Sequence, residues 1–397
     1  MKHFALATGL LLAGSVAALW GVVLIPGPPA SSPILLDRSG AMPAADRAGL
    51  LPAPADGRCV RLGFVGDIMQ HRAQAGDDFA DSYGRVAPVI RGFDFAVGNL
   101  EFPVDPTRPV GPEPGAVRFN GSGPHLDALA GAGFDALVTA NNHSFDQGHA
   151  GLRRTVEEVG RRRLRQVGAA SSKAGLAVPG MADIGGVRVG LAAFTRPVNA
   201  YLDREGEYTW PTDSLPLLVL NFSDWTREYR DQGRRLFQSQ VAAGRGAGAE
   251  LMVALVHWGE EWHFGASDDQ RRAAHDMIEA GFDLVVGMHS HVLGPAEIYR
   301  GRLIAYSLGN FISDFRPLAA RTGAILAVDV RKGADGRVSV SDFEFQPVLV
   351  EPGSHAVHPL GAPQTDEQEA AWALAREMLG GAAQSAKDAR GQCRLSS

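Results

Sequence analysis

The stretch from Gly281 to His291 reads GFDLVVGMHSH and decides the fold. Gly281 suits the left-handed position that ends a helix. The apolar run after Asp283 suits a short buried strand, and Ser290 and two histidines collect where that strand ends. We therefore expect a helix, a buried strand and a polar strand end in succession, which is typical of an α/β sheet.

The same pattern occurs elsewhere in the chain. GFDFAVGNLE covers 92–101 and GFDALVTANNH covers 133–143, and two further apolar runs, 60–65 and 251–256, lead to Asp67 and His257. The irregular spacing of these units argues against a repeat protein. Because ligands bind at the carboxyl ends of strands in α/β sheets, we expect the polar strand ends to meet at one rim.

Divalent metal chemistry accounts for this set of polar residues. Carboxylates can bridge two ions, neutral imidazoles supply nitrogens, and amides supply neutral oxygens. A thiolate zinc cluster is excluded, because the chain has 2 cysteines. Most of the residues also have a simpler interpretation. Asp67 could cap a helix or form a turn, 141–143 could be a turn with a buried histidine, and His257 could pack against Trp258.

Six motifs follow one another along the chain: GDIM at 66–69, GNLE at 98–101, ANNHSFDQG at 140–148, HWGE at 257–260, GMHSH at 287–291 and YSLGNF at 306–311. In this order they resemble the CapA (poly-γ-glutamate capsule synthesis) family over about 58–350. That family is related to calcineurin-like metallophosphoesterases. The resemblance implies an α/β fold of the metallophosphoesterase-like type, a four-layer sandwich of two packed mixed sheets flanked by helices.

The resemblance also implies one or two divalent metal ions, and Mn, Zn and Fe all suit the ligands. The implied ligands are Asp67 and His291 for the first ion, Glu101 as the bridge, and Asn142, His257 and His289 for the second ion. His143, together with Asp146, would act as an acid or stabilise an oxyanion. Substrate contacts are expected from Asn99, Asn141, Trp258, Glu260 and Asn310.

Two regions near the expected site have a second interpretation. Gly309 and Asn310 could form a hairpin turn instead of lining the site. The long irregular segment 196–224 suits a lid or substrate-shaping insertion, but it could also be an ordinary surface excursion.

The chain departs from the phosphoesterase pattern at the first motif. The related enzymes carry a histidine two residues after the first aspartate, where this chain has Met69, and an aspartate where it has Glu101. Methionine is a poor ligand for a hard ion, so we expect the first metal position to be weak or empty unless His71 substitutes. This departure argues against plain phosphoesterase activity.

The chain divides into four segments. Residues 1–25 form an N-terminal membrane anchor or signal segment, because the uncharged run from Phe4 to Ile25 is long enough to span a bilayer. Residues 26–57 are a Pro/Ala-rich linker, 58–350 the main domain and 351–397 a C-terminal helical extension. Lys2 favours a single-pass protein in the cell membrane with its main domain extracytoplasmic; secretion after signal cleavage is the alternative. Cys59 and Cys393 could form a disulfide or remain two free thiols.

The composition narrows the function classes. A net charge of −6 on 397 residues with 45% hydrophobic residues is an ordinary globular composition and does not suit a nucleic-acid binder. Three classes remain. The chain could be a metal-dependent hydrolase or transferase acting on an anionic capsular polymer or a phosphoester. It could be a non-catalytic polymer-binding subunit beside membrane-bound synthetase or export subunits, or a cell-envelope hydrolase unrelated to capsule.

Overall fold

The computed structural model describes residues 45–111, 118–169, 177–196, 199, 227–380, 383 and 393. The expected anchor, most of the linker and most of the irregular segment 196–224 lie outside these residues. Within the described part, no helix is both long and apolar enough to cross a bilayer.

The first sheet has eight strands and carries half of the expected site. Its order is β14 (Val357–Pro359), β13 (Val338–Val350), β12 (Thr322–Lys332), β1 (Arg58–Ile68), β2 (Phe95–Leu100), β3 (Ala136–Val138) and β4 (Arg165–Val167), with β11 (Asn310–Ile312) beside β1. The strands from β1 to β4 are parallel, whereas β12, β13 and β14 pair antiparallel. The sheet is therefore mixed.

The second sheet has six strands and carries the other half. Its order is β5 (Gly180–Ile184), β6 (Val187–Thr195), β7 (Leu251–His257), β8 (Leu284–Met288), β10 (Arg302–Ala305) and β9 (Ala296–Tyr299). The four central strands are parallel, and the edge strands β5 and β9 are antiparallel to their neighbours. Strands β7 and β8 are buried along their whole length, as their continuous apolar runs predict.

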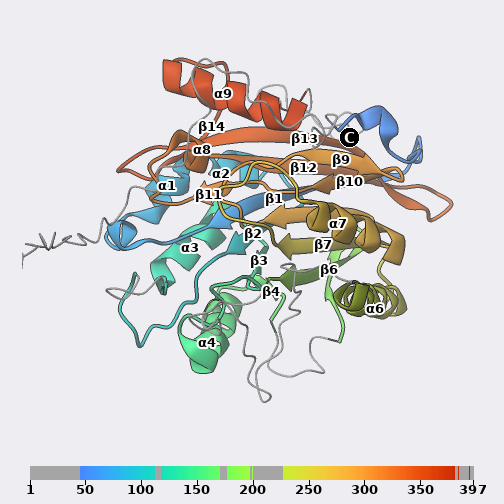
Figure 1. The fold of residues 1–397 in the computed structure, drawn as a ribbon, viewed down its shortest axis with the longest axis horizontal. Coiled ribbons are helices and arrows are strands. Elements are labelled where there is room, and N and C mark those ends of the chain that lie inside the picture. The colour runs from blue at the N-terminus through green and yellow to red at the C-terminus, as the bar shows by residue number, and fades with distance from the viewer. Residues whose placement is uncertain are drawn as a thin grey trace, which may run out of the picture.

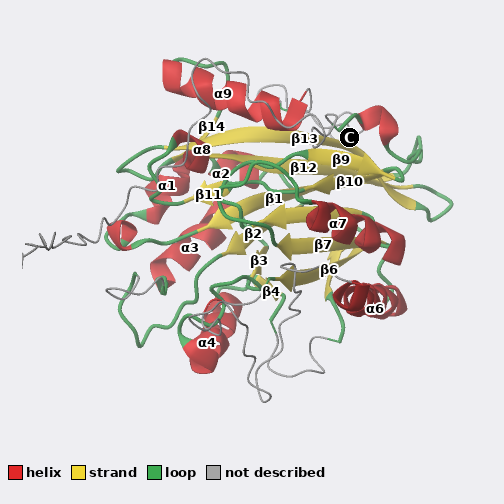
Figure 2. Cartoon of the chain, viewed as in Figure 1, coloured by secondary structure: helices red, strands yellow, loops and turns green. Residues whose placement is uncertain are grey.

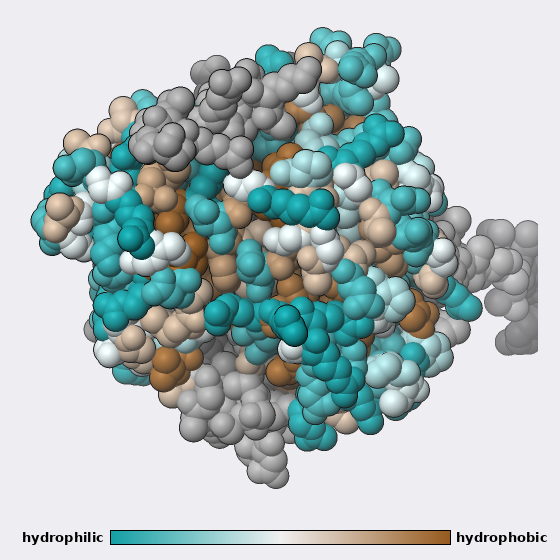
Figure 3. Space-filling view, turned by 180° about the vertical axis from the view of Figure 1, so that it is seen from behind, coloured by the Kyte–Doolittle hydropathy of each residue, from teal (hydrophilic) through white to brown (hydrophobic). Residues whose placement is uncertain are grey.

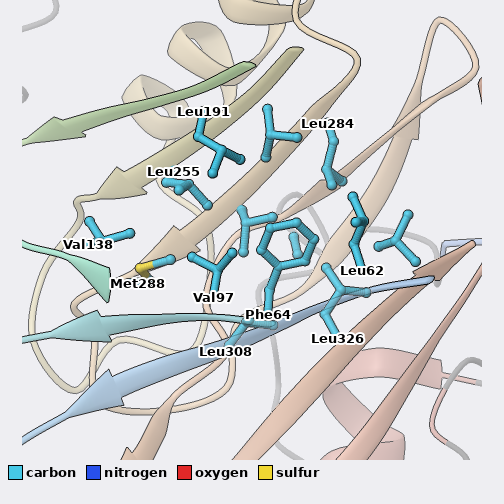
Figure 4. Close-up of a cluster of buried hydrophobic side chains, with 14 of the residues drawn as sticks. Leu62, Phe64, Val97, Val138, Leu191, Leu255, Leu284, Met288, Leu308 and Leu326 are labelled. Carbon is cyan, nitrogen blue, oxygen red and sulfur yellow. The ribbon is translucent and has the colours of Figure 1, made fainter. Parts of the chain in front are cut away.

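The main apolar core lies between the two sheets. Figure 4 shows Leu62, Phe64 and Val97 of the first sheet facing Leu191, Leu255 and Leu284 of the second. All of these side chains belong to one buried cluster. The two sheets therefore form the inner layers of a sandwich.

Helices cover the outer faces of both sheets (Figures 1 and 2). On the first sheet lie α1 (Phe79–Gly84), α2 (Ala87–Ile90), α3 (Gly123–Ala132) and α4 (Gly148–Arg161); on the second lie α6 (Arg227–Gly246) and α7 (Asp268–Ala280). Two further helices, α8 (Leu318–Arg321) and α9 (Asp366–Leu379), contact β12, and the short 3-10 helices span Arg47–Gly49 and Arg72–Gln74. The expected four-layer sandwich of two mixed sheets flanked by helices is confirmed.

Few large hydrophobic side chains reach the surface of the described part. Those that are exposed there are Leu51 and Val178. Figure 3 shows hydrophilic and hydrophobic residues interspersed over one face. Burial of the apolar side chains in the layers described above is thus nearly complete.

The glycine caps follow the predicted pattern at two of three places. Gly133 and Gly281 end α3 and α7 in the left-handed conformation, at φ 104° and 112°. Gly92 does not, because α2 ends at Ile90 and its cap residue, Arg91, has a right-handed conformation. The prediction for Gly92 was wrong, since its helix is a single turn that stops one residue early.

Cys59 and Cys393 form a disulfide with their Cα atoms 5.2 Å apart. Cys59 lies in β1 at the centre of the first sheet, and Cys393 follows α9. The bridge joins residues 334 positions apart. Of the two alternatives that the sequence left open, the structure shows the bridge.

A buried histidine ties the loop between β13 and β14 to two other segments. His355 is 3% exposed; its two ring nitrogens lie 2.6 Å from Asp77 Oδ2 and 3.0 Å from Asp314 Oδ1. Burial disfavours the protonated ring, but the hydrogen bonds and charges of Asp314 and Asp77 outweigh it and raise the pKa of His355.

Candidate metal centre

The six predicted metal ligands converge at the carboxyl ends of strands from both sheets. The ligand atoms form two overlapping groups, each within 4.8 Å: one joins Asp67, Glu101 and His291, and the other joins Glu101, His257 and His289. Asn142 joins the second group, because its Oδ1 lies 2.7 Å from His257 Nε2. Every one of these side chains is buried. The predicted convergence is therefore what the structure shows.

The backbone brings Asp67 to this position through a close approach of β1 to the loop before β11. A Cβ at Gly66 would lie 1.9 Å from the carbonyl oxygen of Gly309, so only glycine permits the approach. Asp67 then donates its backbone N–H to Gly309 O over 3.0 Å, and Glu101 donates to Ile68 O over 2.9 Å. The two carboxylates consequently emerge side by side.

Hydrogen bonds and a nearby histidine favour the ionised form of Asp67. Its Oδ1 accepts a hydrogen bond from Asn99 Nδ2 at 2.7 Å, and the backbone N–H of His289 lies 3.1 Å from its Oδ2. Burial alone would raise the pKa of Asp67. The hydrogen bond and charge of His291, 3.4 Å away, outweigh burial and lower it.

Glu101 is shared by both groups and has no hydrogen-bonding partner among the residues that the structure describes. Both of its carboxylate oxygens are buried and lack a partner within the described part. Its Oε1 lies 3.4 Å from His257 Nε2 and 3.9 Å from His291 Nε2. Burial, and then the charge of Asp67, raise the pKa of Glu101 well above its usual range. A bridging cation would satisfy both oxygens at once.

The second group offers neutral nitrogen and amide ligands. Burial lowers the pKa values of His257 and His289 well below their usual range, so both rings are neutral. Their ring centroids are 4.5 Å apart. Among the described residues, His289 Nδ1 and Asn142 Nδ2 are buried without a partner, which again leaves polar atoms for a ligand to satisfy.

The loop that carries His289 and His291 has an unusual backbone. His289 and His291 adopt φ values of 103° and 59°, in the left-handed region that non-glycine residues rarely occupy. Ser290 stabilises this conformation, because its hydroxyl donates to Val292 O at 2.9 Å and contacts Ser307 Oγ. Such conformations persist where the surroundings fix them, and they cluster at functional sites.

Three residues expected to contact substrate instead support the ligands. Asn99 donates to Asp67 and accepts from Asn141 Nδ2 at 3.2 Å. Asn310 Oδ1 lies 3.0 Å from His291 Nδ1, and its amide donates to two backbone carbonyls. All three are fully buried, so the geometry gives them the role of orienting the ligands.

The other two expected substrate contacts are placed differently. Trp258 is fully buried in the core between the second sheet and helices α6 and α7, where its Nε1 donates to Tyr306 O at 3.0 Å. Its assignment to substrate binding was wrong, because the ring faces the helices. Glu260 is 85% exposed at the side chain and lies 3.8 Å from His263. It is free to face a ligand from solvent.

His143 and Asp146 form a hydrogen-bonded pair beside the ligands. His143 Nδ1 lies 2.7 Å from Asp146 Oδ2, which also accepts the backbone N–H of Phe119 at 2.7 Å. The ring packs edge-on against Phe119. The carboxylate therefore fixes the ring with its proton on Nδ1 and leaves Nε2 for proton transfer.

Met69 and His71 belong to neither ligand group. Met69 packs in the apolar cluster on the helix side of the first sheet. His71 lies between Phe119 and Phe315, and burial lowers its pKa to about 3. Neither residue joins the two ligand groups, although Nε2 of His71 is buried without a hydrogen-bonding partner in the described part.

Arg196 is a site residue that the sequence analysis missed. It follows β6, donates its backbone N–H to His257 O at 2.9 Å, and places Nη1 2.6 Å from His289 Nε2. The signal was present, because Arg196 follows the apolar run 189–194 after Thr195, much as Asp67 follows the run 60–65 after Gly66.

Comparisons with known proteins agree with the motifs. The family described as bacterial capsule synthesis protein PGA_cap matches residues 61–315. The PGA biosynthesis protein CapA of Bacillus subtilis is 29% identical over 289 residues, covering 71% of this chain and 70% of its own. The capsule biosynthesis protein CapA of Bacillus anthracis is 27% identical over 291 residues, covering 71% and 67%.

Among solved structures, NAD nucleotidase of Haemophilus influenzae superposes with a TM-score of 0.39 at 11% identity, covering 81% of this chain. The chain spans only 63% of that protein. The family match is the stronger finding, because it covers more than half of the chain and includes every predicted site residue. The chain therefore belongs to the bacterial capsule synthesis protein PGA_cap family.

Proposed function

We propose that the chain is a metal-dependent hydrolase or transferase that acts on an anionic polymer of the poly-γ-glutamate type, or on a phosphoester, in capsule synthesis or export. The buried carboxylate of Glu101 carries this proposal. It lies between two sets of ligand atoms and has no hydrogen-bonding partner within the described part. A structural carboxylate would be paired, whereas a metal ligand must keep its oxygens available.

The donor set fits two divalent ions of the Mn, Zn or Fe kind. Asp67, Glu101 and His291 would hold one, and Glu101, Asn142, His257 and His289 would hold the other. When bound, such a pair supplies positive charge for an oxyanion and makes water more acidic. His143 then transfers a proton at Nε2, and Asp146 keeps the ring in the required tautomer by accepting from Nδ1.

The disulfide supports a location outside the cytoplasm. Bridges persist in oxidising compartments and are rare in the cytosol. With the bridge between Cys59 and Cys393, we assign the domain to the outer side of the cell membrane, attached through residues 1–25. Membrane-bound synthetase or export subunits are the partners that this placement suits.

One observation favours a second candidate, a polymer-binding subunit without turnover. Met69 lies in an apolar cluster, so the first group keeps three protein ligands. Three ligands suit an open catalytic position, but they also suit a weakly held ion that only binds anionic groups.

The test compares metal content with turnover in the purified full chain. Wild type should bind divalent metal by elemental analysis and should cleave or transfer a poly-γ-glutamate oligomer or a simple phosphoester. His143→Gln should keep the metal and lose turnover about 10²- to 10⁴-fold, the usual contribution of a general acid or base. His275→Gln is the matched control, because this histidine of α7 pairs with Glu297 of β9 and belongs to neither ligand group. If wild type binds metal and polymer but shows no turnover, the result would refute the enzyme and favour the polymer-binding subunit.

A further inference from the structure

Arg196 is a cation in the metal centre that the proposed function has not used. Its side chain is half-buried, and Nη1 lies 2.6 Å from His289 Nε2 and 3.4 Å from Gly259 O. In the described part it forms no ion pair with a carboxylate, although Glu261, Glu260 and Glu101 lie near enough to act on its charge. A desolvated guanidinium without an anionic partner calls for a reason.

The contact with His289 fixes the tautomer of that ring. A guanidinium has donors and no acceptor, so Nε2 of His289 must accept the hydrogen bond. The ring then carries its proton on Nδ1, the buried nitrogen that has no partner in the described ranges. A metal ion needs a nitrogen with a free lone pair. In this arrangement one nitrogen is protonated and Arg196 occupies the other.

Metal at His289 and Arg196 at His289 therefore exclude each other. If the ion binds Nδ1, the proton must move to Nε2, where it would point at a donor. If the ion binds Nε2, it takes the place that Arg196 occupies. In either case, a guanidinium and a divalent cation within a few ångströms also repel each other.

We propose that Arg196 is an exchangeable arm of the site: it holds His289 when metal is absent, and when metal binds it turns to the anionic group of the substrate. Its planar fork matches the two oxygens of a carboxylate or a phosphate. The backbone hydrogen bond to His257 O keeps the arm next to the ligands in both states. This inference rests on the proposed function and names the residue that recognises the substrate's anion.

The first test measures metal affinity, which needs no turnover. The chelator-treated full chain is titrated calorimetrically with Mn²⁺. Arg196→Gln removes the competitor and the repulsion, and it should bind Mn²⁺ about tenfold more tightly. Arg188→Gln is the control, because Arg188 is exposed at the opposite end of the same strand, β6. Unchanged or weaker Mn²⁺ binding by Arg196→Gln would overturn the inference.

The second test measures anion binding by the metal-loaded chain. Inorganic phosphate and a γ-glutamyl dipeptide are titrated separately, and the probe that Arg196→Gln binds at least tenfold more weakly identifies the anion. Arg196→Lys keeps the positive charge without the planar fork, so its affinity for the anion should fall less than that of Arg196→Gln. Because this change is conservative, it also controls for a folding defect. If wild type and Arg196→Gln bind each probe with the same affinity, the proposed role of Arg196 in anion recognition would be refuted. A wild type that binds no metal would instead refute the proposed function.

Discussion

Replacing Glu101 by glutamine should raise the stability of the metal-free protein and lower that of the metal-loaded protein relative to wild type. Glutamine keeps the size of the side chain and resembles the protonated carboxyl, the form that burial and the charge of Asp67 favour in the folded protein. Above its unfolded pKa, a carboxyl group whose folded pKa is raised lowers the free energy of unfolding, by about 1.4 kcal/mol for each pKa unit, and glutamine removes this cost. At pH 7 with chelator, the free energy of unfolding of Glu101→Gln should therefore be about 1–3 kcal/mol higher than that of wild type.

Metal should reverse this order. A ligand at a thousandfold excess over its Kd stabilises the folded state by about 4.1 kcal/mol. Wild type should gain that amount, whereas Glu101→Gln loses the bridge that both ligand groups share and should gain little. The gain of wild type exceeds the cost of the unpaired carboxylate, so wild type becomes the more stable protein.

Urea unfolding with chelator measures the effect of the substitution on the metal-free protein, and urea unfolding with saturating Mn²⁺ measures the stabilisation by metal. Glu344→Gln is the matched control, because this buried carboxylate pairs with Arg61 away from the metal centre. It should lower stability equally in both conditions. The reasoning fails if Glu101→Gln is destabilised in chelator, or if Mn²⁺ stabilises it as much as wild type.

Three further predictions concern other parts of the molecule. His257→Ala should remove about one equivalent of metal in elemental analysis and abolish metal-dependent turnover; unchanged metal content would contradict its role as a ligand. Cys393→Ser should lower the free energy of unfolding by about 2–5 kcal/mol in urea, because the bridge closes a long loop, and reductant should then have no further effect. Equal stability of the two proteins would count against the bridge. His355 has a raised pKa, so the folded protein holds its proton more tightly than the unfolded chain, and this stabilisation is complete below about pH 6.5. It should fade as pH rises through the folded pKa, and His355→Gln should flatten that part of the stability curve; parallel curves would refute it.

The ligand positions could be predicted because strand direction constrains them. In a parallel sheet, the residues that follow the buried strands lie at the same edge of the sheet, independently of how the loops connect those strands. His257 and His289 could therefore be placed together from two apolar runs, without knowledge of the connections between them. The family resemblance then divided the ligands between two ions, which the runs alone did not do.

The alternation of side chains along a strand explains why Trp258 does not contact the candidate site. Consecutive side chains of an extended backbone point to opposite faces. His257 faces the ligands, so Trp258 must face the helices, and the alternation could have excluded it from substrate binding. Asn99 and Asn310 are different, because whether an amide contacts substrate or a ligand depends on distances that only the folded chain sets. Arg196 was missed because it begins the irregular segment 196–224, whose composition indicates a loop, whereas its position is set by the end of β6.

The disulfide and the metal centre lie at opposite ends of one strand. Cys59 and Asp67 are eight residues apart on β1, which separates them by about 26 Å at the usual rise of a strand. The covalent link that joins the beginning of the domain to its C-terminal region is therefore remote from the chemistry. Under the proposed membrane attachment, the segment that precedes β1 enters the domain at the end of the strand opposite to the candidate metal centre.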